Sequence, residues 1–152
     1  MTNDATGRSE WGASPEYRAA RALEILADDP AVIANGIVPG EITDEAAVMT
    51  MVVRPDQANS HEICHGGLVL ALADSATAYA LNTAEASSLW VTSNLTAQFL
   101  RPARLGEELR ATARLAWDGG GRQRLYDTAV TNAAGETVLL MRAQMTRLNA
   151  PA

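Results

Sequence analysis

Residues 59–82 read NSHEICHGGLVLALADSATAYALN, and this stretch decides the fold of the chain. It opens as a polar loop, turns through Gly66-Gly67 and continues as an Ala/Leu-rich run with no breaker until Asn82. Because Ala and Leu are strong helix formers, we predict a helix over 67–81. The run is apolar almost all round, which is typical of a helix buried on every side. Its one formal charge, Asp74, would be costly to bury without a partner or a use, so Asp74 is the first candidate functional residue.

Two short helices and a hairpin are expected before the central stretch. Ser14-Pro15-Glu16 has the residue types of a helix start, and Asn35-Gly36 has those of a helix end. The hydrophobic period then changes to two, which indicates strands. The expected elements are a helix over 14–27, a helical turn over 30–35, and strands over 37–43 and 46–53.

Long strands follow the central helix, because apolar and polar residues alternate between turn signals. They are predicted over 87–100, 107–117, 124–132 and 136–148. Strict alternation in the first of them places Leu89, Val91, Leu95, Ala97 and Phe99 on one face, and Trp90, Thr92, Asn94, Thr96 and Gln98 on the other. In the second it places Leu109, Ala111, Ala113, Leu115 and Trp117 on one face. Elements in this order form an α+β fold, in which a long antiparallel sheet can wrap around one apolar helix.

Length and composition restrict the class of protein. The chain has 152 residues and a net charge of −6, which fits one domain and argues against nucleic acid as the main partner. One cysteine, Cys64, excludes an internal disulfide, and no run is long enough to span a membrane. We therefore expect a cytoplasmic protein with a disordered tail over 1–13 and a single domain over 14–152.

A specific motif lies inside the central stretch. Asn59, His61 and Cys64-His65-Gly66-Gly67 are followed at fixed spacing by Leu72-Ala73-Asp74 and Asn82. This pattern resembles the acyl-CoA thioesterases of phenylacetate degradation, the PaaI type. A second match is the strand end at 98–102, QFLRP, and the element order matches from about 31 to 148. The resemblance implies the hotdog fold, a curved antiparallel sheet wrapped around a long central helix.

The resemblance also implies an enzyme and its site. The activity would be hydrolysis of a CoA thioester, with arylacetyl-CoA such as phenylacetyl- or hydroxyphenylacetyl-CoA favoured, and coenzyme A would enter only as part of the substrate. Gly66 would supply an oxyanion-binding amide, and Asp74 would be the nucleophile or the general base. The further candidates for substrate binding are Asn59, His65, Gly67, Ser75 and Thr77. Ser75 and Thr77 could support the carboxylate or a water, and Asn59 and His65 could equally order the loop.

Helix geometry adds an expectation about assembly. Gly66 and Asp74 are eight residues apart, which is about 12 Å along a helix axis. One thioester carbonyl cannot reach both groups of a single helix. We therefore expect a homodimer whose sites are shared between chains, and the resemblance implies a homotetramer.

Other functions fit parts of the pattern. Residues 61–65, HEICH, match the zinc-protease pattern, but Gly66 follows at once, which indicates a loop rather than a helix; no metal or redox cofactor is expected. A hotdog enoyl-CoA hydratase or dehydratase would commonly need a cavity histidine, and His65 is the candidate. A non-catalytic acyl-CoA-binding regulator would need an output element, and the sequence provides none.

Among the arginines, Arg101, Arg104, Arg122 and Arg124 lie near strand ends, where CoA phosphates could bind.

Overall fold

A computed structural model of the chain describes residues 13–84 and 87–148. The strands are β1 (Val38–Ile42), β2 (Ala47–Val52), β3 (Leu89–Phe99), β4 (Glu108–Asp118), β5 (Gln123–Thr131) and β6 (Thr137–Leu148). The helices are α1 (Pro15–Ala27), α2 (Pro30–Ala34) and α3 (Gly66–Asn82), with a 3-10 turn over Pro55–Gln57. Apart from residue 13, the predicted tail lies outside the described residues, and the single domain over 14–152 stays a prediction.

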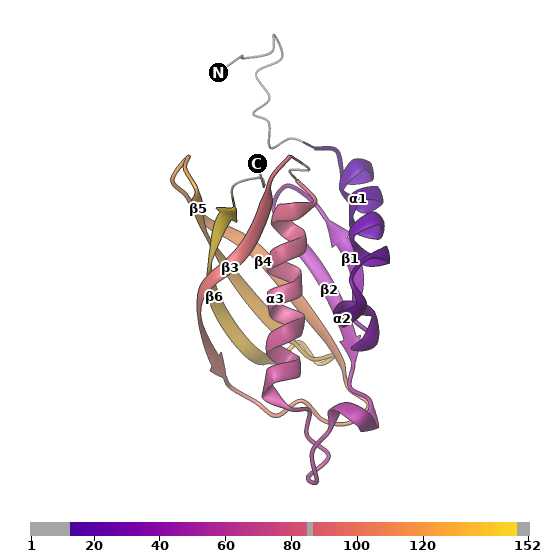
Figure 1. The fold of residues 1–152 in the computed structure, drawn as a ribbon. Coiled ribbons are helices and arrows are strands. Elements are labelled where there is room, and N and C mark those ends of the chain that lie inside the picture. The colour runs from indigo at the N-terminus through magenta and orange to yellow at the C-terminus, as the bar shows by residue number, and fades with distance from the viewer. Residues whose placement is uncertain (1–12, 85–86, 149–152) are drawn as a thin grey trace.

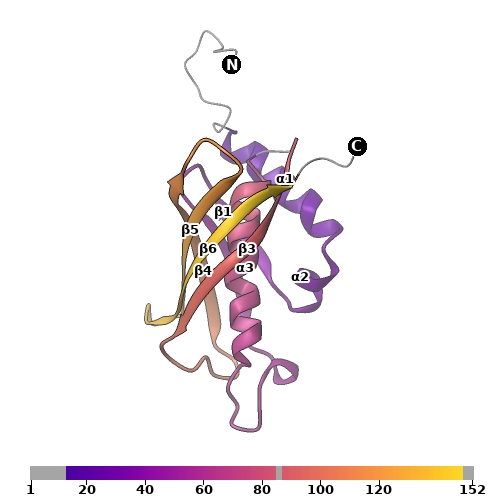
Figure 2. The same ribbon diagram turned by 60° about the vertical axis from the view of Figure 1, so that its left-hand side comes forward.

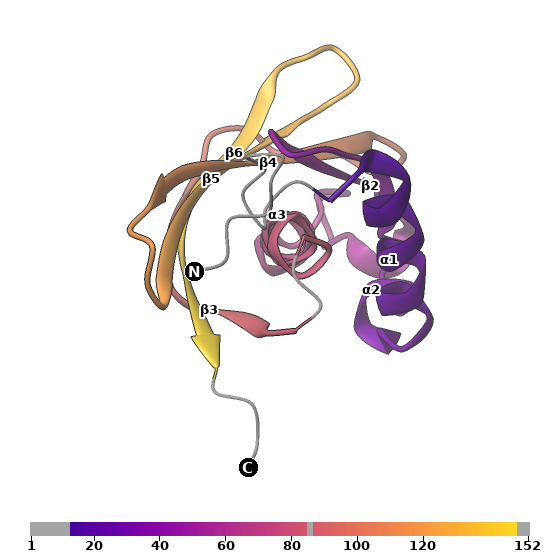
Figure 3. The same ribbon diagram turned by 90° about the horizontal axis from the view of Figure 1, so that it is seen from above.

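The six strands form one antiparallel sheet in the order β1-β2-β4-β5-β6-β3. Figure 1 shows α3 lying along this sheet, and the view from above in Figure 3 shows the sheet curving around it. Both views place α1 and α2 to one side of α3. The predicted α+β fold, a curved antiparallel sheet wrapped around a long central helix, is confirmed.

The core lies between the concave face of the sheet and α3. Met49 and Met51 of β2, Leu109 of β4 and Leu72 of α3 are among its fully buried side chains. The alternation predicted for β2 is confirmed, since its neighbours Thr50 and Val52 remain partly or largely exposed. Burying a large apolar side chain of this kind contributes roughly 1.5–3 kcal/mol.

Two β-bulges correct the predicted faces of the long strands. In β3 the register with β6 shifts between Thr92 and Asn94, so Ser93 is the extra residue. The inward face therefore carries Trp90 and Thr92 before the bulge, and Leu95, Ala97 and Phe99 after it. Strict alternation was wrong here because one inserted residue exchanges the two faces.

The second bulge lies in β4, where the register with β5 shifts between Leu115 and Trp117. Leu115 is opposite the buried Tyr126, whereas Trp117 is opposite Leu125 on the outer face. Trp117 was therefore assigned to the wrong face. Its ring packs over the β4–β5 turn, where a Cβ on Gly119 would meet it.

α3 is not buried on every side, which corrects the expectation from its composition. One stripe along it stays partly or fully exposed, at Gly67, Leu70, Ala71, Asp74, Ser75, Ala78 and Asn82. These residues follow one another at spacings of mostly three or four from turn to turn, so they share one face of the helix. We call these residues the open stripe. The sheet covers one side of α3, and the described part of the chain covers the open stripe only in part.

β3 contacts the open stripe, since its Thr92 donates to Asp74, and it is one of the two end strands of the sheet. Figure 2 shows β3 crossing α3 at that edge of the molecule. It has 11 residues and pairs on one side with β6. An end strand of this length presents backbone N–H and C=O groups to which another strand can pair.

Candidate active site

The histidine loop, residues 59–65, leads into α3 and is ordered by its own first residue. The Asn59 side-chain oxygen accepts from the amides of His61 (2.9 Å) and Ile63 (3.2 Å). Glu62 adopts a φ of 57°, an uncommon conformation for a residue with a side chain. Asn59 therefore orders the loop, and a role for its side chain in substrate binding stays a prediction.

The same loop is fixed to the rest of the protein by its backbone. The Cys64 amide donates to the Ala103 carbonyl at 2.8 Å, and the His65 amide donates to the Gln57 carbonyl at 3.0 Å. His65 is the N-cap residue of α3, its side chain is exposed, and it makes no capping bond. The loop thus delivers Gly66 as the first residue of α3 in one defined position.

The amides of Gly66 and Gly67 are the candidate oxyanion site. Within 13–84 and 87–148, neither amide has a protein acceptor, as expected for the first turn of a helix. The helix dipole adds partial positive charge at this end, so an oxyanion forming there would be stabilised. The two glycines differ in surroundings. A Cβ on Gly66 would lie 3.1 Å from Phe99 Cε1, whereas a Cβ on Gly67 would meet nothing within 4 Å.

A pocket of about 440 Å³ adjoins Gly66. Its inner surface is apolar, with buried Cys64, Val69, Ala103 and Val138. The remaining lining residues are Asn59, Ile63, His65, Phe99, Leu100, Arg101 and Pro102. A carbonyl bound to the Gly66 amide would therefore have apolar space beside it.

Asp74 lies half-buried in the open stripe, near the middle of α3. Thr92 donates its hydroxyl to Asp74 Oδ1 at 2.5 Å, and its oxygen lies 3.3 Å from Met145 Sδ. The bond fixes one carboxylate oxygen and leaves the other without a bond to Thr92. Thr92 was not among the predicted site residues, because its bond to Asp74 joins two different elements and leaves no local signal in the sequence.

Ser75 and Thr77 are not brought to the carboxylate. The Ser75 hydroxyl donates to the Ala71 carbonyl at 2.7 Å, one turn back along α3. The Thr77 hydroxyl contacts the Ala73 carbonyl at 3.1 Å and the Thr128 hydroxyl at 2.8 Å in the core. Ser and Thr in a helix readily bond the carbonyl four residues back. Neither hydroxyl bonds to Asp74 in this structure, and their support of the carboxylate or of a water stays a prediction.

Comparisons with known proteins identify the family of the chain. The family model described as the thioesterase superfamily matches residues 61–124. The acyl-coenzyme A thioesterase PaaI of Escherichia coli strain K12 is 36% identical over 121 residues, covering 80% of this chain and 84% of that protein. This chain belongs to the PaaI-type thioesterases of the thioesterase superfamily.

Solved structures of PaaI proteins extend the match. The E. coli PaaI protein from the phenylacetic acid degradation operon superposes with a TM-score of 0.83 at 34% identity, over 91% of this chain and 98% of that chain. A single-residue mutant of the phenylacetic acid degradation protein PaaI from Thermus thermophilus has a TM-score of 0.72 at 31% identity, over 79% of this chain and 100% of that chain. The hotdog fold and the predicted class of enzyme, a thioester hydrolase, are confirmed.

Two arginines and the cysteine named from the sequence have structural partners or burial of their own. Arg124 is buried, pairs with Asp118 at 2.9 Å and stacks 4.2 Å from the Trp90 ring centroid, so it is not free to bind a phosphate. Arg101 lines the pocket and lies 3.6 Å from Glu136. Burial raises the pKa of the Cys64 thiol, which disfavours its thiolate as a nucleophile.

The HEICH pattern lies in the loop and not in a helix, as predicted. Among the described residues, no group of three or more His, Cys, Asp or Glu side chains is placed to hold a metal ion. Nor is any described helix long and apolar enough to cross a membrane.

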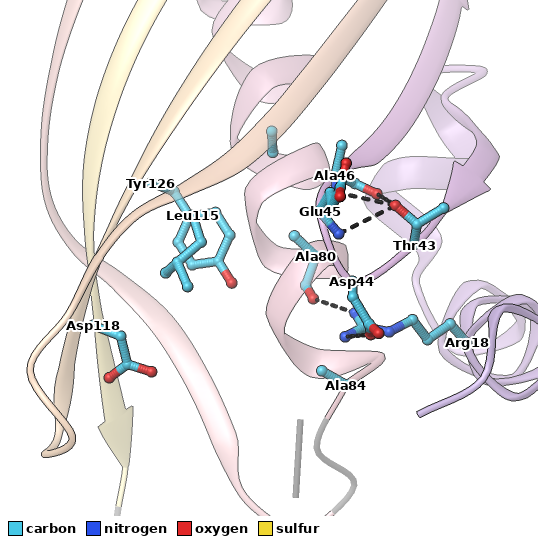
Figure 4. Close-up of a pocket in the computed structure, with 11 residues that line it drawn as sticks. Arg18, Thr43, Asp44, Glu45, Ala46, Ala80, Ala84, Leu115, Asp118 and Tyr126 are labelled. Atoms are coloured by element: carbon cyan, nitrogen blue, oxygen red, sulfur yellow. Dashed lines mark hydrogen bonds and ion pairs between the residues drawn. The ribbon is translucent and has the colours of Figure 1, made fainter. Parts of the chain in front are cut away.

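A second cavity, of about 300 Å³, lies at the opposite end of α3 (Figure 4). Arg18 of α1 is 4% exposed there and donates to the Ala80 carbonyl at 3.2 Å and to Asp44 at 2.9 Å. Burial raises the pKa of Tyr126, which also lines this cavity, to about 12. Neither Gly66 nor Asp74 lines it, so it is separate from the candidate active site.

Proposed function

We propose that this chain hydrolyses acyl-CoA, with an arylacetyl group favoured, at a site built by two copies of the chain. The observation that carries the proposal is the placement of Gly66 and Asp74 on one helix, eight residues apart. That spacing is about 12 Å along the axis, whereas hydrogen bonding and attack each need about 3 Å. A second copy is therefore needed to bring an amide and a carboxylate to one carbonyl.

Two surfaces support a two-fold pairing. The open stripe is the only partly covered face of α3, and β3 beside it is an end strand. If two α3 helices lie antiparallel, the N-terminus of one faces the middle of the other. Each site then takes Gly66 from one chain and Asp74 from its mate, and the symmetry gives two sites per homodimer. A homotetramer rests on the resemblance to the family.

The chemistry follows from the two groups. The thioester oxygen accepts a hydrogen bond from the Gly66 amide, which stabilises the negative charge that develops on it. Asp74 either takes a proton from the attacking water or attacks the carbonyl itself, and Thr92 positions the carboxylate for both routes. With Asp74 as base, water adds to the carbonyl, the carbon–sulfur bond breaks, and the CoA thiolate leaves and is protonated, which gives the free acid. With Asp74 as nucleophile, loss of the thiolate leaves a mixed anhydride between the acyl group and Asp74, and water hydrolyses it to the free acid and the regenerated carboxylate.

The substrate and the location are inferred from relatives. The acyl-CoA class follows the name of the E. coli relative, and arylacetyl groups follow the phenylacetic acid degradation operon named for its structure. The apolar pocket beside Gly66 suits such a group. A hydrolysis screen over arylacetyl, short, medium and long acyl-CoAs, read by thiol release, tests this. The cytoplasmic location stays a prediction.

The shared site is tested by mixing two inactive parents, Asp74→Asn and Gly66→Val. The valine blocks the approach of a carbonyl to the amide. A heterodimer of the two contains one wild-type site and one doubly altered site, so activity should return as subunits exchange. If mass spectrometry proves exchange and no activity returns, or if the active species is a monomer, the shared site is wrong.

No metal or redox cofactor is required by this mechanism, because the helix N-terminus polarises the carbonyl. Dialysis of the enzyme against a strong chelator should leave thioester hydrolysis unchanged. Loss of activity that returns only with added zinc would contradict the mechanism and restore the interpretation of His61 and His65 as ligands.

A further inference from the structure

Phe99 is the only phenylalanine of the chain and the last residue of β3. Its side chain is 54% exposed, although the bulge turns it toward the same face as the core residues Leu95 and Ala97. A single exposed apolar side chain is common in proteins. This one is unusual because it lies directly beside the candidate oxyanion site.

Strand pairing holds the backbone of Phe99, and one edge of its ring packs against Gly66. Its backbone is held by pairing with Leu139 of β6, and the next amide, Leu100, donates to the Val138 carbonyl at 2.8 Å. Its ring edge lies against Gly66, where an added Cβ would be 3.1 Å from Cε1 and 3.4 Å from Cζ. Since Gly66 has no positive φ, the ring contact and not the backbone conformation explains a glycine at this position.

The ring therefore forms one wall of the apolar pocket beside the Gly66 amide. The inner side of that pocket is aliphatic, with Val69 and Val138, so the one phenyl surface it offers is Phe99. A thioester oxygen on the Gly66 amide would lie about 3 Å from that nitrogen. The acyl group attached to that carbonyl then begins next to the ring.

The proposed dimer places the ring close to the chemistry as well. When two copies of β3 pair antiparallel, the Phe99 end of one strand lies near the end of the other that carries Thr92. Thr92 holds Asp74. Phe99 thus belongs to the same composite site as Gly66 of its own chain and the carboxylate of the mate.

We propose that Phe99 is the residue that selects aryl over saturated acyl groups, an inference that rests on the proposed function. The aryl ring of the substrate packs on the fixed Phe99 ring in an offset or edge-to-face arrangement. Such pairs prefer ring centroids about 4.5–7 Å apart and add to the free energy of area burial. A saturated ring of the same size gains the area burial alone.

The test compares phenylacetyl-CoA with cyclohexylacetyl-CoA, which differ in aromaticity and little in shape. We expect Phe99→Leu to lower the kcat/KM ratio of the aryl to the saturated substrate by roughly two- to tenfold. Both substrates lose area buried against the ring, so kcat/KM of cyclohexylacetyl-CoA should also fall, but by less than that of phenylacetyl-CoA. Phe99→Tyr should keep the wild-type ratio, because it retains the ring. Leu140→Ala, a change of another exposed apolar strand residue outside the pocket, is the matched control.

The outcomes separate the role of Phe99 from the proposed thioester hydrolysis. A ratio unchanged in Phe99→Leu, or an equal fall for both substrates, overturns the role of Phe99 while hydrolysis itself stands. If Phe99→Leu fails to fold, Phe99→Met takes its place, since methionine is a large apolar side chain without a ring. If the wild-type enzyme cleaves no acyl-CoA in the wider screen, the proposed function fails instead.

Discussion

The two ends of α3 are built in opposite ways. At the N-terminal end, the amides of Gly66 and Gly67 have no acceptor among the described residues, and an apolar pocket adjoins them. At the C-terminal end, protein groups satisfy the carbonyls. Arg18 donates to Ala80, and Thr83 donates its hydroxyl to the Tyr79 carbonyl at 2.5 Å.

Asn82 strengthens this contrast. Its side-chain amide donates to the carbonyls of Ala78 and Trp90, both at 3.0 Å, and its oxygen accepts from the Trp90 amide at 2.9 Å. The C-terminal end of α3 is thereby tied to the start of β3. Polar groups left open on a helix are available to a ligand, and polar groups satisfied by protein stabilise the fold. We infer that α3 divides function and stability between its N-terminal part with the open stripe and its C-terminal end.

The largest expected effect is on activity and comes from Asp74→Asn. The amide can still accept from Thr92 but is neither a nucleophile nor a base, so turnover should fall by at least about a hundredfold. Thermal unfolding should change little, because no core contact is lost. Thiol release and a melting curve on the same preparation measure both quantities. Turnover near that of the wild type would end the assignment of Asp74.

At the C-terminal end of α3 we expect the reverse: Arg18→Met should lower stability and leave turnover unchanged. The variant loses a charged hydrogen bond to Asp44 and the bond to the Ala80 carbonyl, which should lower the free energy of unfolding by about 2 kcal/mol. Asp44 is largely exposed and can be hydrated. Turnover per folded enzyme should be retained.

Urea unfolding measures this change, and Arg21→Met is its control. Arg21 pairs with Glu24 within α1 at the surface, an interaction worth about 0.3 kcal/mol. If the two variants unfold at the same urea concentration, the C-terminal end of α3 does not hold the stability that we assign to it.

The smallest expected effect separates the two glycines. Gly67→Ala meets open space and should raise the stability of the helix by up to about 1 kcal/mol. Gly66→Ala gains the same helix propensity but forces the Phe99 ring to move, so we expect no net gain. In a Phe99→Leu background the difference between the two alanine variants should shrink. An equal difference in both backgrounds would show that Phe99 does not restrict residue 66.

The sequence predicted the elements of this fold well because their signals are local. Ser14 and Pro30 mark helix starts, and the Ala/Leu run over 67–81 has a strong helix propensity. Gly66 and Asp74 came from spacing and resemblance. Their placement at a free helix end and in a half-buried stripe agrees with the roles predicted for them, which still await a test.

What the sequence missed depends on contacts between distant segments. The bulges at Ser93 and Ala116 leave no mark in the alternation, because small and polar residues suit both faces of these strands. The first bulge lets Thr92, which bonds to Asp74, share the inward face with Leu95 and Phe99. The apolar surface of α3 was attributed to burial within one chain, since composition cannot tell cover by the same chain from cover by another.

At the bulge, the number of residues in β3 decides which side chains face the site, and the identity of residue 93 matters less. The residue itself is exposed, and its hydroxyl bonds to the Gln144 carbonyl and, with either atom as donor, to the Thr146 hydroxyl. A different side chain there would be tolerated. Deleting the residue would turn either Trp90 and Thr92 or Leu95 and Phe99 outward, and would detach the carboxylate support or the aromatic wall from the site. The position should therefore tolerate substitution, whereas an insertion or deletion within the strand should disrupt the site.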